Sequence, residues 1–138
     1  WMTPLLQYIS KNKERGAEMA KIMVVDDAAF MRMMVKNALA QGGYTDVIEA
    51  ADGQEAVKTY SEQKPELVLM DITMPNMDGL EALKKIKELD SDSQVVMCSA
   101  MGQESMVIEA IKSGAKDFIV KPFKPERILK TVTGLLEK

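Results

Sequence analysis

The sequence of 138 residues predicts an α/β fold in which five β-α units build one doubly wound parallel sheet. The first observation is that short apolar runs alternate with longer segments of helical period from Lys21 onward. The second is that these runs hold only four or five residues and are rich in Val and Ile, as in strands buried on both faces. Because crossovers between parallel strands are right-handed, helices are expected on both faces of the sheet.

The predicted strands are residues 22–25, 46–50, 66–70, 94–98 and 117–120. In three of the helical segments, apolar residues recur three and four positions apart: Phe30, Met34 and Ala38; Val107, Ala110 and Ile111; and Ile128, Leu129, Val132 and Leu136. Gly42, Gly43 and Gly114 are predicted to end the first and fourth helices, and Pro125 suits the first turn of the last helix.

Composition and charge indicate an ordinary globular protein. Hydrophobic residues make up 46% of the chain and charged residues 28%, with a net charge of -3, so no basic surface for DNA is expected. No apolar run is long enough to insert into a membrane, and no secretory signal is present. The single cysteine, Cys98, excludes an internal disulfide and is typical of a reducing compartment, so the cytoplasm is the expected location.

Residues 1–20 lie outside the alternation and are interpreted as an N-terminal extension, either a leader, tag or linker or a short docking helix that presents Leu5, Leu6 and Ile9. The folded domain is expected to cover residues 21–138, and Met19 resembles a natural start just before its first strand.

Polar residues follow four of the five predicted strands. Asp26 and Asp27 follow the first strand, Asp71 the third, Ser99 the fourth and Lys121 the fifth. Since ligands of open α/β sheets bind at the carboxyl edge of the strands, these side chains are expected to converge. Each residue alone also has an ordinary explanation as a turn, a helix cap or a solvated lysine.

The second strand offers only Glu49 and Asp52, which we interpret as ordinary loop chemistry. The chain contains no histidine, so any chemistry must use carboxylates, hydroxyls, amines and the backbone.

The converging residues fit a phosphoryl-transfer site. Three carboxylates repel one another unless a cation joins them, and an oxygen-rich, incomplete cage suits Mg²⁺. Lys121 could pair first with an acid and then with an arriving anion, while Ser99 could donate to a phosphoryl oxygen. In such a site a carboxylate can be the nucleophile.

Four stretches carry a family resemblance: VVDDAAFMRMMVKNAL (24–39), VLMDITMPNMDGLEALKKI (68–86), CSAMG (98–102) and GAKDFIVKPF (114–123). Through them residues 21–138 resemble the receiver domain of two-component response regulators, and most closely the single-domain chemotaxis regulators. The resemblance implies a flavodoxin-like fold with strand order 2-1-3-4-5.

The resemblance also implies roles for individual residues. Asp71 would accept a phosphoryl group from a phosphohistidine, and Asp26 and Asp27 would hold Mg²⁺ together with Asp71 and the backbone carbonyl of Thr73. Lys121 would contact the phosphoryl group, and the Lys121-Pro122 bond would be cis.

A switch is implied as well. Ser99 would swing toward the phosphate, and Phe118 would turn inward behind it, which changes the surface of the fourth helix and fifth strand. Thr73 and Met101 flank the path of an attacking water and would tune the lifetime of the phosphorylated state.

The expected protein is therefore a stand-alone response regulator that catalyses only its own phosphoryl transfer and dephosphorylation, rather than an enzyme. Because the chain ends just after the fifth helix, output by protein contact is expected. The protein is also expected to be a monomer. The implied partners are a histidine kinase of the chemotaxis type, the flagellar motor switch protein and a phosphatase. DNA is not an expected partner.

One alternative stays open, and two others fit the sequence poorly. The chain could be a single-domain receiver of a sporulation-type or other phosphorelay. A Mg²⁺-dependent aspartyl phosphatase would carry an acid two residues after its nucleophile, where this chain has Thr73. A flavodoxin-like binding module would need a Ser/Thr/Gly-rich loop after the first strand, where this chain has DDAAF.

Overall fold

The computed structural model describes residues 3–4, 20–100 and 103–137. Its centre is a parallel sheet of five strands in the order β2-β1-β3-β4-β5, which confirms the predicted fold and strand order. The strands are β1 (Ile22–Val25), β2 (Val47–Ala50), β3 (Leu67–Met70), β4 (Val95–Ser99) and β5 (Asp117–Val120). The first and last agree with their predicted bounds, β2 and β3 each begin one residue later than predicted, and β4 is shifted by one residue at both ends.

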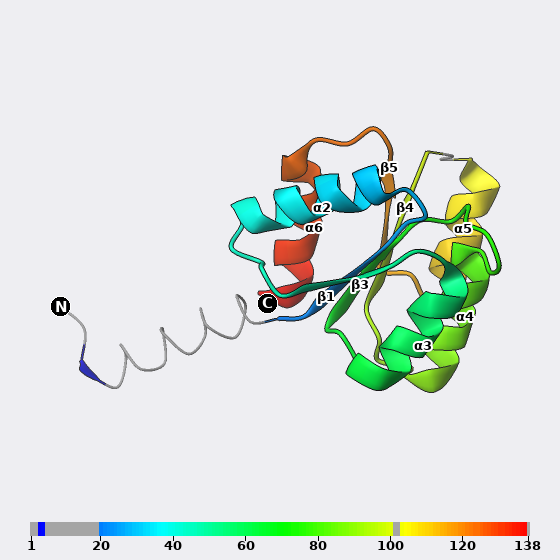
Figure 1. The fold of residues 1–138 in the computed structure, drawn as a ribbon, viewed down its shortest axis with the longest axis horizontal. Helices are drawn as coiled ribbons and strands as arrows, with labels where there is room; N and C mark the ends of the chain where they lie inside the picture. The colour runs from blue at the N-terminus through cyan, green and yellow to red at the C-terminus, as the bar shows by residue number, and fades with distance from the viewer. Residues whose placement is uncertain (1–2, 5–19, 101–102, 138) are drawn as a thin grey trace.

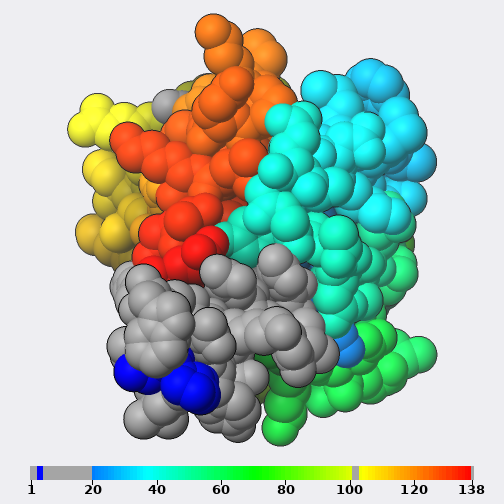
Figure 2. All heavy atoms as spheres, turned by 90° about the vertical axis from the view of Figure 1, so that its left-hand side faces the viewer, coloured from blue at the N-terminus to red at the C-terminus, as the bar shows by residue number. Residues whose placement is uncertain are grey.

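Helices cover both faces of the sheet. They are α2 (Ala29–Gln41), α3 (Gly53–Gln63), α4 (Gly79–Leu89), α5 (Glu104–Lys112) and α6 (Pro125–Leu136). One face carries α2 and α6, and the other carries α3, α4 and α5 (Figure 1). The orange-to-red residues of α6 lie against the cyan residues of α2 and the segment after it (Figure 2). In the part of the chain that the structure describes, no helix has both the length and the apolar character needed to cross a membrane.

The core is two apolar layers that the sheet separates. Along β3, Val68 and Met70 point into the layer below α3, α4 and α5, whereas Leu67 and Leu69 point into the layer below α2 and α6. A strand buried on both faces explains why the sequence of β3 is apolar throughout instead of alternating. Each fully buried aliphatic side chain contributes about 1.5–3 kcal/mol relative to an exposed one, so this strand anchors both layers.

The inward face of α2 differs from the apolar spacing noted in the sequence. Phe30 and Met34 are 65% and 40% exposed, while Val35, Ala38 and Leu39 are buried. The segment carries two apolar stripes, and both satisfy a helical period. Packing against the sheet buries the second stripe, so Phe30 and Met34 lie outside the core, while Ala38 of the same spacing lies within it.

Helix ends follow the local signals. Gly43 and Gly114 have φ values of 86° and 107° and lie just beyond the C-caps of α2 and α5, as the sequence predicts. Asp52 and Asp78 accept hydrogen bonds from backbone N–H groups in the first turns of α3 and α4. These caps fix where the helices begin relative to the strand ends.

Candidate functional site

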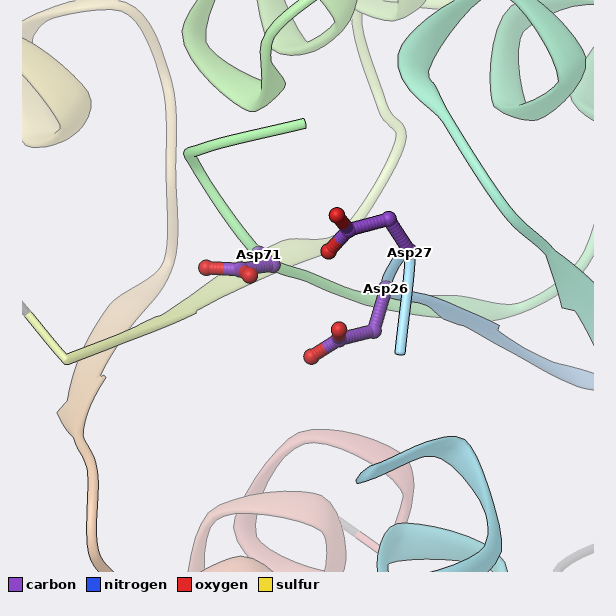
Figure 3. A group of neighbouring side chains, drawn as sticks. All are labelled: Asp26, Asp27 and Asp71. Atoms are coloured by element: carbon purple, nitrogen blue, oxygen red, sulfur yellow. The ribbon is translucent and has the colours of Figure 1, made fainter. Parts of the chain in front are cut away.

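The predicted acidic residues meet at the carboxyl edge of the sheet. Asp26 and Asp27 follow β1, and Asp71 follows β3. One carboxylate oxygen from each lies within 4.8 Å of the others, and the three side chains project into the same space (Figure 3). Asp26 is buried, Asp71 is half-buried and Asp27 is exposed. The adjacent central strands thus bring together acids that are far apart in sequence.

Asp26 is held at every polar atom. Its backbone N–H donates to the carbonyl of Ala50 at 3.1 Å, and its carbonyl accepts from Arg32 Nη1 at 2.6 Å. Its Oδ1 accepts from the backbone N–H of Ala28 at 2.9 Å. Its Oδ2 accepts from Lys121 Nζ at 2.6 Å. The carboxylate is therefore oriented before any ligand arrives.

Asp71 is tied to its surroundings less completely. Its backbone N–H donates to the carbonyl of Val25 at 2.9 Å, and its Oδ1 accepts from the N–H of Ile72 at 2.8 Å. Its Oδ2 lies 3.5 Å from Lys121 Nζ. Burial raises the pKa of the Asp71 carboxyl above its usual value, Lys121 opposes this rise, and the charge of Asp26 adds to it. A further cation would stabilise the ionised carboxylate.

Lys121 bridges two of the acids. Its side chain is 14% exposed, and its backbone N–H donates to the carbonyl of Ser99 at 2.8 Å, which joins the ends of β4 and β5. Burial alone would lower the pKa of the ammonium, but the hydrogen bond to Asp26 and the charge of Asp71 raise it overall. The peptide bond between Lys121 and Pro122 is cis.

The other predicted residues surround this centre. Ser99 is 2% exposed and is the last residue of β4, rather than the first residue beyond that strand as predicted. Phe118 is buried in the layer below α5, and Thr73 is exposed in the loop after Asp71. Met101 lies outside the described residues. The extension of residues 1–20 also lies outside them, apart from residues 3, 4 and 20.

A close turn behind Asp71 leads the chain into α4. The N–H of Gly79 donates to the carbonyl of Ile72 at 2.7 Å. A Cβ atom on Gly79 would lie 1.9 Å from the backbone oxygen of Asp71, so only glycine fits here. The base of the site and the start of α4 are thus in direct backbone contact.

The acids fit a hard divalent cation. Three oxygen ligands from carboxylates lie together, one buried and one exposed, so a bound ion would have protein ligands on one side and solvent on the other. Mg²⁺ prefers oxygen ligands and usually keeps several waters, which such a half-open arrangement permits. Asp26, Asp27 and Asp71 are therefore suitable ligands for Mg²⁺.

Arg32 belongs to the site but escaped the sequence analysis. It lies in the first turn of α2, donates to the carbonyl of Asp26 and pairs with Glu49 of β2. Glu49 therefore lies in strand β2 and pairs with Arg32, rather than being an ordinary loop residue. The sequence signal for Arg32 was a basic residue in the first helical turn after Asp26 and Asp27. This spacing is common on solvent-exposed helices, so it did not single out Arg32.

Comparisons with known proteins agree on one family. The response regulator receiver domain matches residues 22–133. The chemotaxis protein CheY of Bacillus subtilis is 57% identical over 84% of this chain and 97% of its own length. The chemotaxis protein CheY of Thermotoga maritima is 54% identical over 81% of this chain and 93% of its own length. A crystal structure of a CheX-CheY-BeF3-Mg complex from Borrelia burgdorferi contains a similar chain, with TM-score 0.82 and 37% identity over 86% of this chain and 90% of that one.

Proposed function

Because the chain belongs to the response regulator receiver family and is CheY-like, we propose that it is a stand-alone response regulator whose phosphoacceptor is Asp71. Membership places it in two-component signalling. The observation that carries the proposal is the position of Asp71, a half-buried carboxylate beside two further acids and 3.5 Å from an ammonium. Asp26 is only 5% exposed and is therefore less accessible to a phosphoryl donor.

The transfer is a displacement at phosphorus. A carboxylate oxygen of Asp71 forms the new P–O bond while the P–N bond of a kinase phosphohistidine breaks, and the leaving imidazole takes up a proton. Lys121 offers its ammonium to the oxygens of the transferred group. Ser99 supplies a hydroxyl at the end of the neighbouring strand.

The proposed cofactor is Mg²⁺, held by Asp26, Asp27, Asp71 and the backbone carbonyl of Thr73. When bound, it neutralises negative charge on the phosphoryl group and the carboxylates. The three gathered carboxylates support this choice, and the similar Borrelia CheY was crystallised with Mg²⁺ and BeF3.

The output surface is proposed on α5 and β5, the fourth helix and fifth strand of the domain. Phosphorylation gives Asp71 a dianion with new acceptor oxygens, which Ser99 and Lys121 can satisfy only by moving. The backbone bond between Ser99 and Lys121 couples the ends of β4 and β5, and Phe118 lies within β5. A population shift then changes the surface that partners meet.

Exposed apolar side chains support this surface. Ile108 and Ile111 of α5 and Val120 of β5 are 44%, 48% and 48% exposed. A cavity of about 480 Å³ adjoins Val120 and is also lined by Phe118 and Phe123. Apolar groups gathered beside a cavity are typical of protein-binding surfaces.

The proposed partners follow the CheY relatives. They are a chemotaxis-type histidine kinase, the flagellar motor switch protein and a phosphatase; a sporulation-type or other phosphorelay is the alternative. We propose no turnover of any other substrate, and Thr73 in place of an acid disfavours the aspartyl phosphatase. The proposed location is the cytoplasm, where the thiol of Cys98 would stay reduced; burial raises its pKa to about 12.

Phosphorylation by a small donor tests the acceptor. The protein is incubated with phosphoramidate, with and without Mg²⁺, and intact mass is measured. Wild type is expected to gain one phosphoryl group with Mg²⁺, and Asp71→Asn is expected to gain none. Equal gain in Asp71→Asn, or no gain in wild type, would refute the proposal. Capture of phosphorylated protein by the motor switch protein or by a phosphotransfer protein then separates the two pathways.

A further inference from the structure

We propose that Arg32 is a positioning residue for the acidic site, which it serves by clamping the main chain of Asp26 to strand β2. The inference rests on the proposed function, since the purpose of the clamp is to hold a Mg²⁺ ligand. Arg32 touches no reacting group itself. It acts through the carbonyl oxygen of Asp26 and the carboxylate of Glu49.

The contacts of Arg32 differ from those of an ordinary surface arginine. Its Nη1 donates to the backbone oxygen of Asp26 at 2.6 Å, and its Nε donates to Glu49 Oε1 at 3.0 Å. Its side chain is 18% exposed, whereas Lys36, one turn later and paired with the same glutamate at 3.2 Å, is 43% exposed. The guanidinium is thus mostly enclosed between the acidic loop and β2.

Together with a backbone hydrogen bond, these contacts attach Asp26 to β2 at two points. The N–H of Asp26 donates to the carbonyl of Ala50, and Glu49 is the residue immediately before Ala50 in β2. One stretch of β2 therefore holds the amide of Asp26 directly and its carbonyl through Arg32. With both sides of the residue fixed, its carboxylate has little freedom to swing away from Asp71.

Arginine suits this task better than lysine. A planar guanidinium donates in two fixed directions at once, and bonds from a charged donor are about twice as strong as neutral ones. The hydrogen bond from Arg32 is also the leading cause of the lowered pKa of Glu49, so the anchor stays ionised near neutral pH. An ammonium could reach the carbonyl or the glutamate but lacks the fork that spans both.

If Arg32 holds the main chain of a metal ligand, removing its donors should lower the affinity for Mg²⁺. Groups that orient a metal ligand from behind typically change affinity by about 10–100-fold when they are removed. Arg32→Met keeps most of the apolar stem and removes the donors. Lys36→Met is the matched control, because Lys36 lies on the same helix and pairs with Glu49, whereas Asp26 accepts its hydrogen bonds from Ala28, Arg32 and Lys121.

The test measures Mg²⁺ affinity by titration calorimetry and metal-free stability by urea unfolding. Arg32→Met is expected to weaken Mg²⁺ binding by about tenfold, and Lys36→Met to change it by less than about twofold. Glu49→Ala is expected to weaken binding in the wild-type background and to have no further effect in Arg32→Met, since both act through one clamp. Arg32→Lys is expected to weaken binding in the same direction, which keeps the test available if Arg32→Met does not fold.

A second readout needs no metal. Hydrogen exchange of the metal-free protein is expected to accelerate across residues 24–28 in Arg32→Met and not in Lys36→Met. Wild-type affinity in Arg32→Met, or an equal loss in Lys36→Met, would overturn the clamp, even if unfolding showed lower stability. A wild type that binds no Mg²⁺ would count against the proposed function, and the exchange data would still decide whether Arg32 holds Asp26.

Discussion

Lys121 Nζ donates a hydrogen bond of 2.6 Å to Asp26 Oδ2, across 95 residues of sequence. The ammonium therefore holds one of the two carboxylate oxygens that the most buried acid of the site could offer to a metal ion. Lys121 and a divalent cation compete for Asp26, although both lower the repulsion among the acids. The bridge also ties β5, the last strand of the sheet, to the end of β1.

Replacing Lys121 by Met should separate these two effects. Without its ammonium, the metal-free protein is expected to lose about 2 kcal/mol of unfolding free energy, because a mostly buried charge pair is broken. The same substitution is expected to raise Mg²⁺ affinity by about tenfold, because the competitor at Asp26 is gone. Urea unfolding and titration calorimetry measure the two quantities. Exposed Lys112→Met is the control, and weaker Mg²⁺ binding in Lys121→Met would contradict the competition.

Two glycine substitutions should change the unfolding free energy in opposite directions. Gly79→Ala is expected to cost at least about 3 kcal/mol of unfolding free energy, since its Cβ would lie 1.9 Å from the backbone oxygen of Asp71. Gly134→Ala in α6 meets no atom within 4 Å and is expected to gain up to about 1 kcal/mol through helix propensity. Urea unfolding of both variants checks the pair. A neutral Gly79→Ala would show that the turn behind the site can relax.

Tyr60→Phe should show a pH dependence. The hydroxyl of Tyr60 donates to Asp90 Oδ2 at 2.8 Å, and this bond is the leading cause of the lowered pKa of Asp90. A lowered acid pKa stabilises the fold above the ordinary carboxyl pKa, and the contribution disappears as the pH falls through the folded-state value. Tyr60→Phe is therefore expected to lower Tm by a few degrees near pH 7, with the difference narrowing below about pH 4. Calorimetry across that range tests it; a constant difference would assign the effect to packing.

Ser99→Ala should separate phosphorylation from switching. The variant keeps Asp71, the two other acids and the backbone bond from Lys121 to residue 99, so phosphoramidate is expected to load it to within about twofold of wild type. It lacks the hydroxyl that would follow the phosphate. Hydrogen exchange over residues 117–123 is therefore expected to change on phosphorylation in wild type and much less in Ser99→Ala. Equal changes in both proteins would remove Ser99 from the switch.

The fold could be predicted because its signals are local and repeated. A strand buried on both faces, such as β3, is apolar at every position, and Gly43 and Gly114 mark helix ends by their positive φ values. The inward face of α2 could not be predicted, because its two apolar stripes have the same period. Packing against the sheet decides between Phe30 and Leu39, and a single segment does not contain that information.

The acidic site was predictable for a different reason. Parallel strands place their carboxyl ends at one edge, so the acids after β1 and β3 had to meet once the topology was assumed. The partners of those acids were less accessible to prediction. Arg32 reaches Asp26 through its main chain, and a backbone carbonyl leaves no trace in residue types. Similarly, the choice of Lys121 between Asp26 and Asp71 depends on distances of 2.6 Å and 3.5 Å that only coordinates provide.

The residues of the site are spread along the sequence, with Asp26 near the beginning of the domain and Lys121 near its end. A nascent chain that has produced β1 to β4 but not β5 holds all the acids and lacks the ammonium that bridges them. Such a chain contains the proposed acceptor, Asp71, without its neighbouring ammonium. The complete site, with Lys121 between Asp26 and Asp71, therefore exists only once β5 has joined the sheet.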